Sequence, residues 1–192
     1  MRKLTHDEIS ANRSSLDQIH TVKKLPVIVL LNSIRSSYNV GSIFRTSDGA
    51  MIKKLILCGY TPHPPIDENS PGNKDVLKTA LGSTQSVEWE YIKSPIEAIK
   101  NLKAQGIKIC ALELTENSNP YYNINKNDFP ICLVVGNEIT GVSQEVLDLC
   151  DYSIEIPQYG IKQSLNVAVA YGIAIFEMRK IFDQDVKIKP QQ

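Results

Sequence analysis

The sequence has no excess of charge of either sign. Lysine and arginine together number 21, aspartate and glutamate together number 21, and the formal net charge is therefore zero. Proteins that bind nucleic acid over a wide surface usually carry a basic excess. This balance argues weakly against a nucleic-acid partner, although it leaves room for a local basic patch.

Cysteine pairs and histidine clusters are also missing. The cysteines lie far apart without a C-x-x-C spacing, and most fall in apolar, strand-like runs. We therefore expect reduced, mostly buried thiols of a cytoplasmic protein, and neither a disulfide framework nor a zinc site. The histidines are not spaced as metal ligands, so no metal site is expected, and His63 is expected on a loop surface. The cysteines are Cys58, Cys110, Cys132 and Cys150.

A membrane span is not expected. The charge-free stretch near the C-terminus covers only residues 163–176, whereas a membrane helix needs about 20 apolar residues. The N-terminus is polar and has no apolar segment of the kind found in secretory signals. We therefore expect neither a membrane partner nor a signal peptide.

Several common motifs are absent as well. G-x-G-x-x-G does not follow the first predicted strand, and neither a P-loop nor a G-x-S-x-G elbow occurs. Their absence disfavours a standard dinucleotide site, a phosphate-binding P-loop and an α/β-hydrolase nucleophile.

The chain divides into three parts by composition. Residues 1–24 are polar and charged, and Thr5-x-x-Glu8 predicts a capping box that opens a helix running towards His20. Residues 25–182 contain regular apolar runs and are expected to form one domain. Residues 183–192 are expected to form a C-terminal tail.

Strand-like and helix-like segments alternate through the central part. This alternation predicts an α/β fold with a mainly parallel sheet and helices on both faces. In such sheets, ligands bind where the strands end. The predicted strands are 27–31, 55–58, 86–92, 107–114, 131–135 and 153–156, and the predicted helices are 39–49, 75–81, 95–105, 143–150 and a last one that follows residue 163.

Three polar or glycine-rich loops follow predicted strands, and the first opens a helix. Asn39 can cap this helix, Gly41 permits another backbone to approach closely, and Arg45 projects from the second turn. An arginine beside a helix N-terminus can hold a phosphate. For this segment alone, an ordinary surface arginine is the favoured interpretation.

The second loop follows the strand 131–135. It contains Gly136, Asn137, Glu138 and Gly141 before a predicted helix. The two glycines suggest a backbone that bends tightly around a ligand. A turn that carries polar residues and binds no ligand is an equally good explanation of this loop alone.

The third loop lies between Pro157 and the last helix. Gly160 is expected to have positive φ, and Ser164 is expected to cap the helix. That helix is apolar almost all round, which predicts burial on several sides. Its first turn nevertheless carries Ser164 and Asn166, where free N–H groups gather. These two residues predict either a ligand site or simply a helix cap.

The three segments together are specific. Asn39-x5-Arg45, Gly136-Asn-Glu-x-x-Gly141 and Ile156-Pro-x-x-Gly-x-x-x-Ser-Leu-Asn-Val-Ala168 occur in this order. The chain thereby resembles the SpoU/TrmH family of the SPOUT superfamily, RNA ribose 2′-O-methyltransferases, over about residues 26–180. The resemblance implies a SPOUT-type α/β knot with a C-terminal trefoil knot, S-adenosylmethionine as cofactor, and a homodimer with the site near the subunit interface.

The resemblance also implies roles for ten residues. The cofactor would lie against five of them and be held by backbone groups of their loops, and five others would act in catalysis or position the substrate. Arginine stays protonated and cannot act as a base, so Arg45 is expected to hold a neighbouring phosphate that takes the proton. The cofactor-binding residues would be Leu112, Glu113, Gly136, Ile156 and Leu165, and the catalytic residues Asn39, Arg45, Glu138, Ser164 and Asn166.

The RNA substrate is less well determined. Transfer RNA is favoured over ribosomal RNA because the chain is compact. A non-catalytic RNA-binding dimer of the same fold is the main alternative, and a nucleotide-binding oxidoreductase is a remote one. In the absence of net positive charge, a dimeric patch is expected to bind the RNA, built from Lys23, Lys24, Arg35, Lys53, Lys54 and Lys162.

Overall fold

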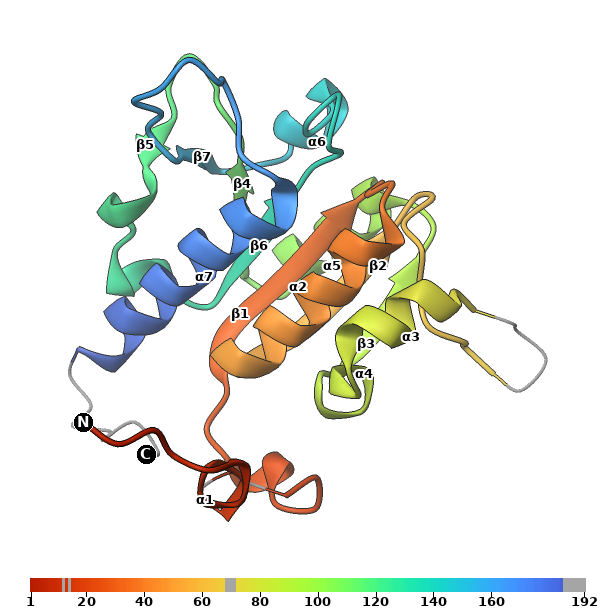
Figure 1. The fold of residues 1–192 in the computed structure, drawn as a ribbon. Helices are drawn as coiled ribbons and strands as arrows, with labels where there is room; N and C mark the ends of the chain where they lie inside the picture. Colours follow the sequence, from red (N-terminus) through yellow and green to blue (C-terminus); the bar gives the residue numbers. More distant parts are fainter. Residues whose placement is uncertain (12, 14, 68–71, 185–192) are drawn as a thin grey trace.

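The structure is a computed structural model that describes residues 1–11, 13, 15–67 and 72–184 (Figure 1). The expected C-terminal tail lies outside the described residues from position 185 onwards. Within the described part, seven strands form one sheet in the order β3-β2-β1-β6-β4-β7-β5. Every neighbouring pair is parallel, which confirms the predicted sheet type. The strands are β1 Leu25–Asn32, β2 Ile52–Cys58, β3 Trp89–Ile92, β4 Lys108–Leu112, β5 Asn119–Pro120, β6 Ile131–Val135 and β7 Tyr152–Glu155.

Helices cover both faces of the sheet, as predicted. In Figure 1, α2 and α7 lie in front of the sheet and α5 lies behind it. The α-helices are α1 His6–Ala11, α2 Ser37–Ala50, α3 Lys74–Ala80, α4 Ser83–Ser86, α5 Pro95–Ala104, α6 Gln144–Leu147 and α7 Val167–Asp183. Three short 3-10 helices are η1 Ile19–Thr21, η2 Tyr121–Asn123 and η3 Lys126–Asp128.

The central strand β1 shows why its apolar run is continuous. Val27, Val29 and Leu31 pack into the core formed with α2, α3 and α7. Ile28 and Leu30 point the other way, into the core formed with α5 and α6. Because successive side chains of a strand point to opposite faces, a strand covered on both faces must be apolar throughout.

The predicted N-terminal helix is shorter than expected. The capping box is confirmed, because Thr5 N donates to Glu8 Oε2 at 2.8 Å and Glu8 N donates to Thr5 Oγ1 at 3.3 Å. However, α1 ends at Ala11, and the separate helix η1 covers the region near His20. None of the residues of α1 is buried, so no tertiary packing extends the helix.

The four thiols are free, as expected, and three of them are fully buried. Burial raises the pKa of Cys58 to about 12 and that of Cys150 to about 11. These thiols therefore stay protonated near neutral pH and are poor nucleophiles. No helix among the described residues is long and apolar enough to span a bilayer.

His63 differs from its expected place on a loop surface. Its imidazole is half-buried and packs against two aromatic rings, with centroid distances of 4.8 Å to Tyr91 and 6.5 Å to Trp89. The proline-rich loop therefore folds back over the edge strand β3.

Candidate active site

Three loops come together at the carboxyl edge of the sheet. They follow β1, β6 and β7, which lie close together in the strand order. The segments after β4 and β7 also rise side by side there (Figure 1). Together, the segments after β4, β6 and β7 enclose a cavity of about 560 Å³. A site at this edge is the usual arrangement in parallel α/β sheets.

All five residues predicted to bind a cofactor line this cavity. Its volume lies within the roughly 300–1,000 Å³ typical of small-molecule sites. Its lining combines apolar side chains with backbone of the glycine-containing loops, and Ile139 and Ile154 are among the further lining residues. The predicted residues are Leu112, Glu113, Gly136, Ile156 and Leu165.

Glu138 joins the loops after β6 and β1. Its carboxylate accepts hydrogen bonds from Arg35 N at 2.8 Å, Ser36 N at 3.0 Å and Asn39 Nδ2 at 2.8 Å. Burial opposes ionisation of this carboxyl, but these hydrogen bonds outweigh it and hold the pKa of Glu138 below its ordinary value. The group is therefore a fixed anion that organises the start of α2, and it is not a reservoir of protons at neutral pH.

A second hydrogen bond extends this network to the last helix. Asn166 Nδ2 donates to Asn39 Oδ1 at 3.2 Å, and Asn39 in turn donates to Glu138. Residues from three segments that are far apart in the sequence thus form one chain of hydrogen bonds. Ser164 lies at the mouth of the cavity, next to this chain.

Two predicted helix caps are wrong. Ser36 caps α2, accepting a hydrogen bond from Asn39 N at 3.4 Å, so the Asn39 side chain is free to bind Glu138. Asn166 caps α7, with its Oδ1 accepting from Ala168 N at 2.9 Å. Ser164 therefore precedes the helix and is not its cap. Serine and asparagine cap helices about equally well, so residue type alone cannot choose between them.

Arg45 lies apart from the other predicted catalytic residues. Six positions along a helix correspond to about 120° around its axis, so Arg45 projects from a different side of α2 than Asn39. Its side chain is exposed and is not part of the cavity lining. Among the described residues, it makes no hydrogen bond or ion pair. The structure therefore brings together four of the five predicted catalytic residues: Asn39, Glu138, Ser164 and Asn166.

The glycines explain how the backbone packs so closely. A Cβ on Gly41 would lie 2.7 Å from Val76 O of α3, which confirms the predicted close approach. Gly141 has φ of +67°, and it exchanges two backbone hydrogen bonds of 3.0 Å with Asn137. Gly160, by contrast, does not have the positive φ expected from the sequence.

Replacing Gly136 by alanine is expected to destabilise the protein by about 1–3 kcal/mol, as overpacking usually does. A Cβ at this position would collide with the backbone of Gly141 and Val142. Urea unfolding would measure the effect. The matched control is Gly160→Ala, where a Cβ meets nothing within 4 Å, and a change within about 0.5 kcal/mol is expected. Equal stability of the two variants would contradict the packing argument.

Within a single chain, the six basic residues predicted to form a dimeric patch do not all lie together. Lys24 and Lys54 lie near the amino ends of β1 and β2, and both pair with Glu88, at 3.7 and 3.6 Å. Arg35 follows β1, whose eight residues span about 26 Å. Of the six, Arg35 and Lys162 lie at the carboxyl edge. A single chain therefore does not bring all six residues together, and the dimeric patch stays a prediction.

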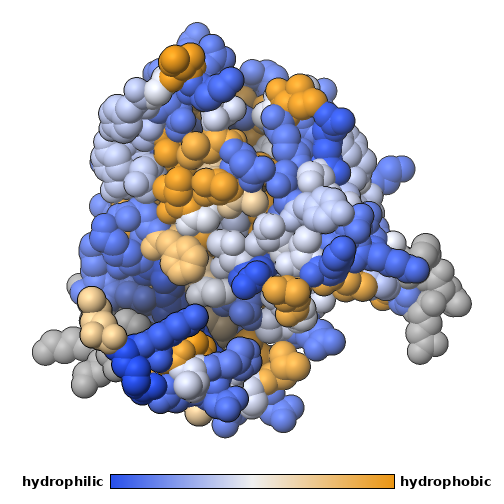
Figure 2. All heavy atoms as spheres, viewed as in Figure 1, coloured by the Kyte–Doolittle hydropathy of each residue, from blue (hydrophilic) through white to orange (hydrophobic). Residues whose placement is uncertain are grey.

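The last helix is less buried than its composition predicted. Val169 and Phe176 are 52% and 51% exposed. Figure 2 shows apolar side chains gathered on this side of the molecule, over α7. The other side of α7 packs against α2, where Tyr171 Oη and Ser47 Oγ form a hydrogen bond of 2.7 Å.

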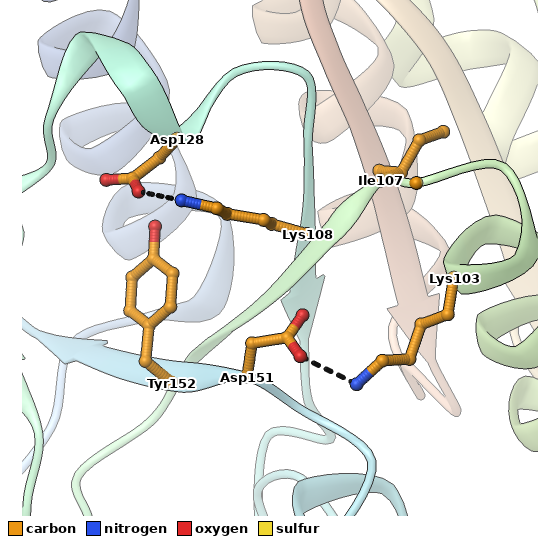
Figure 3. A pocket seen from close by; sticks show the side chains of 7 residues that line it. Lys103, Ile107, Lys108, Asp128, Asp151 and Tyr152 are labelled. Carbon is orange, nitrogen blue, oxygen red and sulfur yellow. Dashed lines mark hydrogen bonds and ion pairs between the residues drawn. The ribbon is translucent and has the colours of Figure 1, made fainter.

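A second hollow, of about 450 Å³, lies at the opposite edge of the sheet. In Figure 3, Tyr152 stands between two ion pairs, Lys108–Asp128 and Lys103–Asp151, each 2.7 Å long. Each of these lysines is thus neutralised by an aspartate. This hollow contains none of the predicted site residues, and its aspartates fasten the segments before β6 and β7 to β4 and α5.

The parallel α/β fold and the cavity of ligand size between converging loops are those of a ligand-binding α/β protein. A comparison with known families agrees with this geometry. The profile of the SpoU rRNA Methylase family matches residues 26–176. The chain belongs to this family.

Two relatives and one solved structure illustrate the similarity. The chain is 30% identical to a tRNA (guanosine(18)-2′-O)-methyltransferase of Aquifex aeolicus, with 86% of this chain and 74% of that protein covered. It is 29% identical to the 23S rRNA (guanosine-2′-O-)-methyltransferase RlmB of Vibrio parahaemolyticus, with 86% and 64% covered. The SpoU methyltransferase AviRb of Streptomyces viridochromogenes, in complex with the cofactor AdoMet, superimposes with a TM-score of 0.70 at 26% identity, covering 86% and 64%. Parts of all three proteins lie outside the match.

Proposed function

We propose that this protein transfers a methyl group from S-adenosylmethionine to a ribose 2′-hydroxyl of structured RNA. The observation that carries the proposal is the hydrogen-bond chain Glu138–Asn39–Asn166 beside a cavity of ligand size. Membership of the SpoU family and the names of both relatives support it. We favour tRNA over rRNA as substrate, and the names of the relatives include both kinds.

The cavity fits S-adenosylmethionine chemically. Leu112, Ile156 and Leu165 offer an apolar surface for an adenine ring, and the loop at Gly136 offers backbone groups for its polar edge. Glu113 is already engaged, since its carboxylate accepts from Val142 N at 2.8 Å and from Leu114 N at 3.0 Å. It therefore holds the loops that form the cavity. When bound, S-adenosylmethionine supplies an electrophilic methyl group to the ribose oxygen.

The chain's own residues would prepare the RNA. A ribose hydroxyl is a poor nucleophile and must lose its proton. Arg45 stays protonated and cannot accept it. In our proposal, Arg45 holds the phosphate next to the target ribose, that phosphate takes the proton, and the guanidinium stabilises the negative charge that develops. Ser164 and Asn166 orient the ribose at the mouth of the cavity.

A homodimer would bring Arg45 of one chain to the cavity of the other, because Arg45 does not line the cavity of its own chain. We propose that a second copy packs on the exposed face of α7 that contains Val169 and Phe176, next to α2. Exposed apolar side chains of this kind are typical of interfaces. Arg45 is exposed on α2 and would then reach the partner's cavity. The C-terminal trefoil knot stays a prediction from the resemblance.

Calorimetry with S-adenosylmethionine and with NAD tests the proposed function first. One S-adenosylmethionine should bind per chain, NAD should not bind, and Leu165→Glu should abolish binding by placing a charge in the cavity. Mass spectrometry of ribose-methylated nucleosides, from cells with and without the gene, then tests the reaction. Binding without any change in these nucleosides would favour the non-catalytic alternative.

A further inference from the structure

An exposed tyrosine stands next to the candidate active site. The Tyr60 side chain is 63% exposed, yet its hydroxyl is fixed, because Asn137 Nδ2 donates to Tyr60 Oη at 2.8 Å. Asn137 is only 7% exposed and lines the cavity. The same Nδ2 also donates to Ser33 O at 2.8 Å, so Asn137 ties the tyrosine to the loop that precedes α2.

The turn that carries this tyrosine is held from both sides. Thr61 is 2% exposed, and its hydroxyl donates to Cys58 O at 2.6 Å, with Leu31 O also within reach at 3.1 Å, and accepts from Ile34 N at 3.0 Å. On the other side, Tyr91 Oη donates to Gly59 O at 2.7 Å. Gly59 has φ of +63°, a conformation that favours glycine. The ring of Tyr60 is therefore presented on a rigid turn.

The position of the ring restricts what it can contact. Tyr60 does not line the cavity that we assign to the cofactor, so adenine bound there would not stack on it. It lies on the side of the cavity where Glu138 fixes the backbone of Arg35 and Ser36. The exposed Arg35 on this side can attract the phosphates of an RNA chain. Aromatic rings beside such cations are the usual stacking surfaces for unpaired RNA bases.

We propose that Tyr60 forms a subsite on which one unpaired base of the RNA substrate stacks, next to the ribose that is methylated. This inference rests on the proposed function and adds to it a class of substrate: RNA whose target nucleotide lies in a loop or another unpaired region. The subsite reads no particular base, because every base has a face that can stack.

Fluorescence of an RNA hairpin with 2-aminopurine in its loop tests the subsite. Binding is measured with saturating S-adenosylhomocysteine, so that no reaction is needed. The wild-type protein should quench the fluorescence as the base stacks on the ring. Tyr60→Ala should lose the quenching and bind the hairpin roughly tenfold more weakly. Tyr60→Phe keeps the ring, and it should quench and lose less than about threefold in affinity.

Tyr122 provides the matched control. It is 52% exposed and lies on η2, directly after β5, which is the outermost strand at the opposite end of the strand order from β3 and β2. Tyr122→Ala should bind and quench like the wild-type protein. Quenching by Tyr60→Ala equal to the wild type, or wild-type binding without quenching, overturns the stacking proposal alone. If the wild-type protein binds S-adenosylmethionine but no RNA, the proposed function fails as well.

Discussion

Replacing Arg45 by alanine is expected to lower kcat for methyl transfer by about 10²-fold or more, as losing a group that stabilises transition-state charge usually does. The affinity for S-adenosylmethionine and the free energy of unfolding should stay unchanged. Within its own chain the side chain is exposed and does not line the cavity, and in the proposed dimer it holds the RNA phosphate and not the cofactor, so neither property should depend on it. Single-turnover rates with saturating RNA would measure the effect. Arg45→Lys keeps the charge but loses the two-pronged geometry, and should recover only part of the rate.

A mixing experiment tests whether Arg45 acts on the partner's site. Arg45→Ala and Leu165→Glu should each be inactive alone. Mixed dimers would hold one site with an intact cavity and an intact arginine, so an equal mixture should recover roughly a quarter of the wild-type activity. No recovery, although mixed dimers form, would place the arginine in its own chain's site or outside catalysis. A wild-type rate for Arg45→Ala would contradict its role altogether.

Replacing Glu138 by alanine is expected to cost about 2 kcal/mol of stability, because three donors lose a charged acceptor, and to abolish activity. Glu138→Gln keeps the shape and loses the charge, so part of the loss should remain. The low pKa of Glu138 sets the pH dependence. The stabilisation is present above the ordinary glutamate pKa and is lost as pH falls through the lower, folded-state pKa. In urea unfolding, the free energy of unfolding of Glu138→Gln should thus be lower than that of the wild type at pH 7. The difference should shrink as acid protonates the native carboxylate.

Glu116 provides the control for this pH series. It is exposed, and its loop follows β4 near the same edge of the sheet. Glu116→Gln should follow the wild type within about 0.5 kcal/mol at every pH. A Glu138→Gln difference that does not depend on pH would mean that the carboxylate's charge contributes nothing to the junction of the two loops.

The sequence was sufficient to predict a mainly parallel sheet and six of its seven strands, but neither the two-residue strand β5 nor the details of the loops. Short, continuous apolar runs such as Ile131–Val135 are typical of strands covered on both faces, and this one is buried throughout. The ends of helices were harder. Ser36 and Asn39, or Ser164 and Asn166, are all good caps, and the path of the loop decides which one is used.

The candidate site, too, could be predicted only in part. The five residues that the resemblance assigned to the cofactor all line the cavity, because its motifs follow strands that end side by side. The resemblance could not place Arg45, whose exposed side chain does not line the cavity of its own chain. It also gave no sign of Tyr60, since a single tyrosine in a loop has no periodicity, and its role depends on Asn137, 77 positions away.

The helix α7 lies beside both the cavity and the surface proposed for the second copy. The N-terminus of α7 carries Asn166 beside the cavity, and Val169 and Phe176 emerge from the same helix towards the proposed partner. Whatever orders that helix for one task also orders it for the other. If cofactor binding and self-association are coupled through this helix, thermodynamic linkage requires each to change the affinity of the other by the same factor. Where that coupling is favourable, dilution of the proposed dimer into monomers should weaken the binding of S-adenosylmethionine, so that methyl transfer depends on the concentration of the protein.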